Sequence, residues 1–163
     1  MNVVFVEIDR CIACLNCMRV CSFRRDAVHH CQSPRIFVNV DMDQRKIFAG
    51  ICQQCEAAPC MRICPTGALK RDPVTNAVVV DRNLCICCAM CVMACPFGNV
   101  ELDEAQRVAT KCDLCFGAPK CVQVCMAQAL HYGSIDELAE LKRRRGGLRL
   151  AVRAISINED AGQ

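Results

Sequence analysis

The stretch that decides the fold is residues 85–96, CICCAMCVMACP. Cys85, Cys88, Cys91 and Cys95 follow the spacing C-x2-C-x2-C-x3-C, and Pro96 comes directly after the last of them. Gaps of two residues let a short loop wrap three thiolates around one iron-sulfur cubane. The fourth cysteine, beyond a longer gap, is expected to point away from that loop. The spacing therefore predicts ligands of [4Fe-4S] clusters.

Three further groups of four cysteines share this design. Groups one and three are tight, with two, two and three residues between cysteines, whereas groups two and four have a middle gap of four or five residues. They span residues 11–21, 52–64, 85–95 and 112–125. The candidate metal ligands are Cys11, Cys14, Cys17, Cys21, Cys52, Cys55, Cys60, Cys64, Cys85, Cys88, Cys91, Cys95, Cys112, Cys115, Cys121 and Cys125.

The order tight, loose, tight, loose is an internal repeat. Asp9-Arg10 precedes the first group, and Asp81-Arg82 precedes the third. Duplication of a unit with two motifs is the simplest explanation. In two-cluster ferredoxins the last cysteine of each motif ligates the other cluster, so the motifs are expected to work in pairs.

The composition restricts the protein class. Cysteine accounts for 18 of 163 residues, while the chain has one Tyr and no Trp. A disulfide-stapled secreted domain would begin with a basic and then an apolar segment, and residues 1–9 contain neither. A reducing, cytoplasmic setting is expected, where dense cysteine indicates metal. No stretch is long and apolar enough to predict a membrane span.

Structural zinc is the main alternative to iron-sulfur clusters. Sixteen cysteines could form four tetrahedral sites, but zinc sites usually use two separated C-x2-C pairs. Four loops with three cysteines each, two of them ending in Cys-Pro, fit that pattern poorly. The spacing favours iron and sulfide.

The four motifs, from Cys11 to Cys125, resemble the four-cluster iron-sulfur subunits that accompany dimethyl sulfoxide reductase, formate dehydrogenase, formate hydrogenlyase, CO dehydrogenase and tungsten aldehyde oxidoreductases. The resemblance implies an α+β, loop-rich fold of two bacterial-type 2[4Fe-4S] ferredoxin modules related by pseudo-symmetry, and four [4Fe-4S] clusters. It also implies nested pairing, the first motif with the fourth and the second with the third.

Carried onto this chain, the resemblance implies four ligand sets. Set 1 is Cys11, Cys14, Cys17 and Cys125; set 2 is Cys112, Cys115, Cys121 and Cys21; set 3 is Cys52, Cys55, Cys60 and Cys95; set 4 is Cys85, Cys88, Cys91 and Cys64. The inner motifs keep a proline after the fourth cysteine, whereas Ser22 and Met126 stand there in the outer motifs. The outer pair is therefore expected to be more loosely built.

Strands and turns are expected around the motifs. Alternating apolar residues predict strands over 3–8, 36–40, 77–81 and 99–102, and hairpin loops over 41–45 and 72–76. Short helices are expected after each fourth cysteine, for example from Pro65 to Leu69. Ser134 and Glu137 form a capping box that opens a helix reaching Arg145.

The chain is expected to divide into a four-cluster domain, residues 1–133, and a C-terminal helix and tail, residues 134–163, with a possible docking role. The basic residues 142–145 suit a solvated helix end, with a partner-docking patch as the alternative. Cys87 is a spare residue, expected to be small and buried. Cys31, after His29-His30, is assigned to a loop, with a mononuclear metal site as the less favoured alternative.

The expected function is electron transfer rather than catalysis, because no nucleophile with a base is recognisable. The expected partner is a catalytic oxidoreductase subunit with a molybdenum or tungsten pterin, a NiFe site or a CO dehydrogenase centre. A further redox subunit or a second copy of the chain could also bind. The alternatives are a free soluble polyferredoxin and, less favoured, a zinc or redox-sensing protein. Nucleic acid is not expected, since four oxidised clusters would take the net charge from +3 to about −5.

Overall fold

A computed structural model describes residues 1–25 and 34–144 of the chain. Its strands pair into four separate two-stranded antiparallel sheets: β1 (Asn2–Val6) with β8 (Leu130–Ser134), β2 (Ile36–Asp41) with β3 (Lys46–Ile51), β4 (Leu69–Arg71) with β5 (Val78–Val80), and β6 (Val100–Asp103) with β7 (Val108–Lys111). The helical segments up to β8 are η1 (Ile8–Arg10), α1 (Asn16–Arg25), α2 (Pro59–Arg62), α3 (Met90–Met93), η2 (Leu114–Gly117) and α4 (Lys120–Gln123). The small sheets and short helices confirm a ferredoxin-like α+β architecture.

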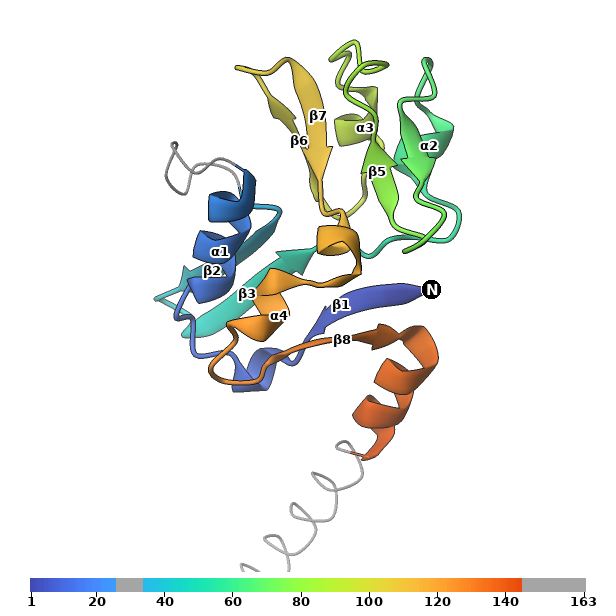
Figure 1. The fold of residues 1–163 in the computed structure, drawn as a ribbon. Coiled ribbons are helices and arrows are strands. Elements are labelled where there is room, and N and C mark those ends of the chain that lie inside the picture. The colour runs from blue at the N-terminus through green and yellow to red at the C-terminus, as the bar shows by residue number, and fades with distance from the viewer. Residues whose placement is uncertain (26–33, 145–163) are drawn as a thin grey trace, which may run out of the picture.

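Two groups of buried residues divide the molecule. One lies within the middle of the chain, from Ala58 to Ala109, and is built around Leu69, Val78 and Val100. The other joins residues from both ends of the described chain, including Val4, Ile36, Leu114 and Leu130. Figure 1 shows the corresponding arrangement, with β4 to β7, α2 and α3 above, and β1, β2, β3, β8, α1 and α4 below.

The lower half is closed by pairing of segments far apart in the sequence. Strand β1 runs antiparallel to β8, with Asn2 opposite Ser134 and Val6 opposite Leu130. This pairing brings the motif that follows β1 close to the motif that precedes β8. The two outer cysteine motifs are consequently neighbours, although about a hundred residues separate them in the chain.

The hairpin predictions are confirmed. Asp72 accepts hydrogen bonds from the backbone N–H and the hydroxyl of Thr75, at 2.7 and 2.6 Å, in the turn between β4 and β5. Asp41 accepts one from the backbone N–H of Gln44 at 2.9 Å between β2 and β3. The carboxylates satisfy turn amides that would otherwise face only solvent. The predicted first strand is too long, because its end forms η1.

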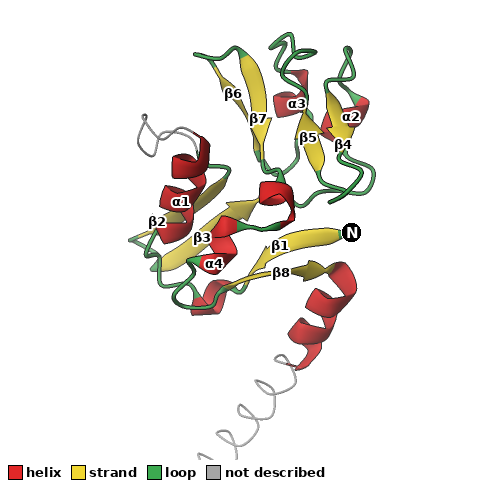
Figure 2. Ribbon diagram, in the orientation of Figure 1, coloured by secondary structure: helices red, strands yellow, loops and turns green. Residues whose placement is uncertain are grey.

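The predicted position of the short helices is wrong. In the two inner motifs and the last one, the helix holds the third cysteine and ends before the fourth, and residues 65–68 form a turn that leads into β4. Pro59, and not Pro65, occupies the helix start in α2, where its missing N–H removes no bond. Figure 2 shows these helices as single turns between long loops.

The predicted capping box is confirmed. The backbone N–H of Ser134 donates to the Glu137 carboxylate at 2.7 Å, and the Glu137 N–H donates to the Ser134 hydroxyl at 3.2 Å. A helix over residues 135–144 follows, and its predicted last residue, Arg145, lies outside the described ranges. The Lys142 ammonium stands 4.3 Å from the centre of the Phe5 ring, so this helix end contacts β1.

Candidate metal centres

Left-handed backbone shapes each cysteine loop. Ala13 and Leu15 in the first motif, and Cys87 and Ala89 in the third, have φ between 52° and 62°. Residues with a side chain adopt this conformation at a cost of about 1 to 2 kcal/mol each. Where left-handed and right-handed residues alternate along the backbone, successive amide N–H groups point toward the inside of the loop. There they favour an anion. The loops are therefore shaped around a group that is not part of the chain.

This strain predicts a stabilising substitution. Ala89→Gly removes the Cβ penalty at φ 62° and is expected to stabilise the protein by about 0.5 to 1 kcal/mol, even after the greater freedom of glycine in the unfolded chain. The measurement is the urea midpoint of the loaded protein. Ala109→Gly is the control, because Ala109 is buried in β7 and its φ is negative, so this variant is expected to lose stability. A lower midpoint for Ala89→Gly would contradict the strain argument.

The cysteines of sets 2, 3 and 4 each surround a separate cavity. Set 2 lines a space of about 470 Å³, set 3 one of about 360 Å³ and set 4 one of about 300 Å³, each including some open solvent. In each case three cysteines come from one motif and the fourth from the motif expected to pair with it. Within the described ranges, no three His, Cys, Asp or Glu side chains converge as they would on a single metal ion.

The cysteines of set 1 are also neighbours. Burial raises the pKa of Cys17 to about 11, and the nearby thiols of Cys14, Cys11 and Cys125 add to the rise. These four residues are the ones expected to act together in set 1. The structure thus brings each of the sixteen predicted ligands together with the other members of its own set.

Burial has the same effect on thiols in the other sets. It raises the pKa of Cys121 and of Cys112 to about 12, and that of Cys91 to about 11. Such thiols hold their protons until a cation replaces them, since metal ligands must be thiolates. A cationic iron-sulfide core supplies that charge, so the donor set and its surroundings fit the [4Fe-4S] group.

Backbone amides from outside the loops donate to ligand sulfur atoms. The N–H groups of Ala129 and Asn99 donate to the sulfurs of Cys125 and Cys95 at 3.3 and 3.4 Å. The N–H of Ala109 in β7 donates to the sulfur of Cys85 at 3.3 Å. Hydrogen bonds to ligand sulfur favour the more negative, reduced state and are one of the terms that set the potential.

Asp113 organises the loop of the fourth motif, and sequence reasoning missed it. Its carboxylate accepts from the Cys115 N–H at 2.9 Å and pairs with Arg24 and Arg35, each at 3.0 Å. The Arg24 guanidinium also lies 4.9 Å from the Phe116 ring centre. The backbone hydrogen bond lies within an Asp-x-Cys sequence and could have been suspected, but the arginines come from distant segments.

The predictions for the two cysteines outside the four sets, Cys87 and Cys31, have different outcomes. Cys87 is only half-buried, so the prediction that it is buried is wrong, and it lines the cavity of set 4. Its φ of 58° places it at one of the sharp bends of the loop. Cys31 and the adjacent histidines lie outside the described ranges, as does the possible metal site there. All cysteines of the described ranges are free of disulfide bonds.

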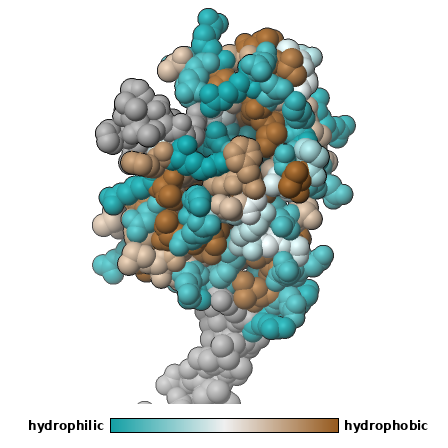
Figure 3. Space-filling view, viewed as in Figure 1, coloured by the Kyte–Doolittle hydropathy of each residue, from teal (hydrophilic) through white to brown (hydrophobic). Residues whose placement is uncertain are grey.

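No helix in the described part of the chain is long and apolar enough to cross a membrane. Apolar side chains are nevertheless exposed on the cysteine loops. Ile86 and Met93 flank set 4, whereas Phe116 and Met126 flank the outer sets, and their exposed fractions range from 61% to 86%. Figure 3 shows hydrophobic residues interspersed with polar ones over one face of the molecule.

Comparisons with known proteins agree with this geometry. The family model for a 4Fe-4S dicluster domain matches residues 43–135. The B subunit of the anaerobic dimethyl sulfoxide reductase of Escherichia coli is 33% identical, over 88% of this chain and 77% of the relative. The polyferredoxin-like subunit of the Pyrococcus furiosus aliphatic sulfonate oxidoreductase is 36% identical, over 75% and 70%. The thiosulfate reductase electron transfer subunit of Salmonella typhi is 35% identical, over 82% and 76%. The chain binds [4Fe-4S] clusters and belongs to the 4Fe-4S dicluster family of iron-sulfur electron-transfer subunits.

Proposed function

We propose that this chain relays electrons through four [4Fe-4S] clusters to or from the catalytic subunit of an oxidoreductase, and that it is not itself a catalyst. The observation that supports four sites is the grouping of sixteen cysteines into four sets, three of them around separate cavities. Each [4Fe-4S] cluster accepts and releases one electron while it stays bound. The proposal assigns two sites to each of two modules, residues 11–21 with 112–125 and residues 52–64 with 85–95.

The contacts between sets favour a linear order. Burial raises the pKa of Cys112 in set 2, and the neighbouring Cys52 of set 3 contributes to the rise. Burial likewise raises the pKa of Cys91 in set 4, and the neighbouring Cys60 of set 3 contributes to the rise. Cysteines of sets 1 and 2 pack against the same buried group. Electrons would pass along sets 1, 2, 3 and 4, so that the crossing between the two halves lies between sets 2 and 3.

The exposed apolar residues support docking at both ends of this order. Ile86 and Met93 lie beside set 4, and Met126 follows Cys125 of set 1 at the other end, while Phe116 follows Cys115 of set 2. We propose that a partner covers these apolar side chains where they adjoin the cysteine loops. One end would contact the catalytic subunit, and the other a further redox subunit or a second copy. The helix and tail from residue 134 onward would form a separate docking segment.

The relatives favour one kind of partner. The three relatives named above are subunits of a dimethyl sulfoxide reductase, an aliphatic sulfonate oxidoreductase and a thiosulfate reductase. A catalytic subunit that acts on a sulfur compound is therefore proposed ahead of the NiFe and CO dehydrogenase types; a molybdenum or tungsten pterin in that subunit is what the family resemblance implies. We propose a reducing compartment, the cytoplasm, because dense cysteine without disulfides is typical there.

Isolation of the native protein under anaerobic conditions tests this function. We expect a larger catalytic subunit to co-elute, and the dithionite-reduced complex to be reoxidised by dimethyl sulfoxide or thiosulfate. Iron and sulfide on a chain that elutes alone would contradict the subunit role and indicate a free polyferredoxin. Zinc without sulfide would contradict electron transfer altogether.

A further inference from the structure

A buried lysine lies where the two halves of the molecule meet. Lys111, the last residue of β7, is 4% exposed. Its ammonium donates to the carbonyl oxygen of Val78 at 2.6 Å, to that of Cys112 at 3.2 Å and to the side-chain oxygen of Gln54 at 3.3 Å. Three N–H donors thus meet three acceptors. The ammonium is held in one place.

Gln54 completes this network. It is 1% exposed, donates to the Cys112 carbonyl at 2.8 Å and accepts from the Val78 N–H at 2.9 Å. Its backbone has a φ of 49° and belongs to the loop of the second motif. The network therefore joins the second motif, strand β5 and the start of the fourth motif around a single charge.

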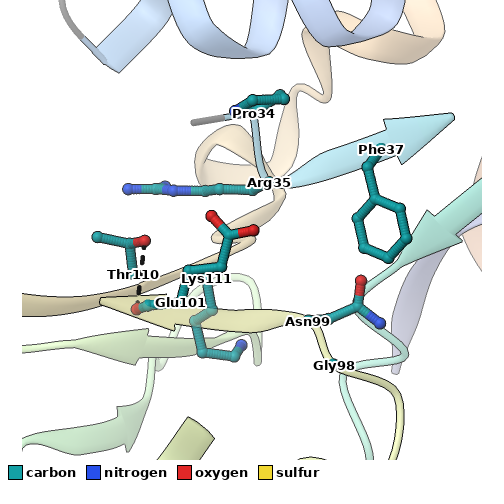
Figure 4. Close-up of a pocket in the computed structure, with 8 residues that line it drawn as sticks. All are labelled: Pro34, Arg35, Phe37, Gly98, Asn99, Glu101, Thr110 and Lys111. Atoms are coloured by element: carbon teal, nitrogen blue, oxygen red, sulfur yellow. Dashed lines mark hydrogen bonds between the residues drawn. The ribbon is translucent and has the colours of Figure 1, made fainter. Parts of the chain in front are cut away.

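The hydrogen bonds of Lys111 leave its charge uncompensated. All three acceptors are neutral, and Figure 4 shows the ammonium and the Glu101 carboxylate on opposite sides of the hairpin of β6 and β7. A buried ammonium without an anion is costly, because burial removes the water that stabilises its charge. Among the described residues no carboxylate forms an ion pair with Lys111, so its charge calls for a negative group of another kind.

The surroundings indicate where that negative group lies. Lys111 lines the cavity of set 3, together with Cys52, Cys55, Cys60 and Cys95. Burial raises the pKa of Cys60, and the Lys111 ammonium partly opposes the rise. It acts in the same direction on Cys112 of set 2. The charge thus faces set 3 and adjoins set 2.

We propose that the Lys111 ammonium is the counter-charge of the cluster held by set 3 and raises its reduction potential, which favours electron transfer between the two halves. This inference rests on the proposed four-cluster function. An oxidised cluster with four thiolates has a charge of about −2, and one added electron makes it about −3. A fixed cation in a medium of low dielectric constant stabilises the more negative state more strongly. The electron comes from the partner's reaction.

A redox titration of the native chain, monitored by electron paramagnetic resonance, tests the proposal. Lys111→Met keeps the length of the side chain and removes its charge. We expect the equilibrium constant for reduction of one central cluster to fall about tenfold, a shift of about 59 mV to lower potential for one electron. Lys46→Met is the control, because Lys46 is exposed at the start of β3. Among the described residues, its ammonium donates only to the side chain of Gln44. Its potentials are expected to equal those of the unmodified chain.

Two further variants separate charge from structure. Lys111→Arg keeps the positive charge and is expected to keep the equilibrium constant for reduction within about threefold of the unmodified value. Lys111→Gln removes the charge but can still donate a hydrogen bond, so it replaces Lys111→Met if the latter fails to hold clusters. Iron content is measured in every sample. A chain without four clusters before substitution would overturn the proposed function itself.

The remaining outcomes decide the role of Lys111. Four clusters with unchanged potentials in Lys111→Met or Lys111→Gln would overturn the inference and leave the proposed function intact. Loss of clusters from both neutral variants, with retention in Lys111→Arg, would also overturn it, since the charge would then serve assembly instead of the potential. If Lys111→Arg shows the same shift of the reduction potential as Lys111→Met, the shift comes from packing and not from the charge. That result would also overturn the inference.

Discussion

Replacing Cys125 and Cys17 together with alanine is expected to remove one cluster, whereas replacing Cys125 and Cys121 together is expected to remove two. Under nested pairing Cys125 and Cys17 serve the same site, so the second substitution has nothing further to remove. Cys125 and Cys121 belong to the same motif but to different sets. We expect iron to fall from about 16 to about 12 per chain in the first variant and to about 8 in the second.

Iron and acid-labile sulfide, determined on anaerobically purified variants, give the answer. Cys87→Ala is the matched control, because Cys87 lines a cavity without belonging to any set, and its iron content is expected to stay at about 16 per chain. The opposite ranking of the two double variants would mean that each motif holds a cluster with its own four cysteines. That result would overturn the nested assignment.

Asp113→Ala is expected to lower the stability of the loaded protein by about 2 to 3 kcal/mol. The substitution leaves Arg24 and Arg35 without their shared carboxylate, and it removes the acceptor for the Cys115 N–H. That hydrogen bond holds a loop in which Leu114, Cys115 and Phe116 have φ values of 54°, 52° and 55°. Strain of this kind persists only where the surroundings enforce it.

The measurement is the urea midpoint of the iron-sulfur absorbance. Asp113→Asn provides the comparison, because the amide oxygen can still accept from Cys115 while the ion pairs are lost. We expect Asp113→Asn to lose about half as much stability as Asp113→Ala. A midpoint for Asp113→Ala equal to that of the unmodified chain would show that the loop does not depend on this carboxylate.

Local signals in the sequence predict local structure correctly. The spacing of the cysteines predicts which three residues of each motif act together, and three cavities contain the triads of the second, third and fourth motifs. Asp72 and Asp41 predict the hairpin turns because an aspartate carboxylate bonds amides only a few residues away. Ser134 and Glu137 predict a helix start for the same reason.

Other features depend on the path of the backbone or on distant partners. Helices α1 and α3 begin before the third cysteine because the left-handed residues Leu15 and Ala89 turn the chain there, and nothing in the identity of a leucine or an alanine indicates positive φ. Arg24 and Asp113 are 89 positions apart, and β1 and β8 lie at opposite ends of the described chain. Nested pairing came from the family resemblance, since the spacing is compatible with other pairings.

The four-cluster account is tested most directly by the iron and acid-labile sulfide content of the unmodified chain, isolated anaerobically. It predicts about 16 of each per chain, from four [4Fe-4S] clusters on sixteen cysteines. About 8 of each would mean that only two sets are occupied. Zinc without sulfide would contradict the assignment of all four sets.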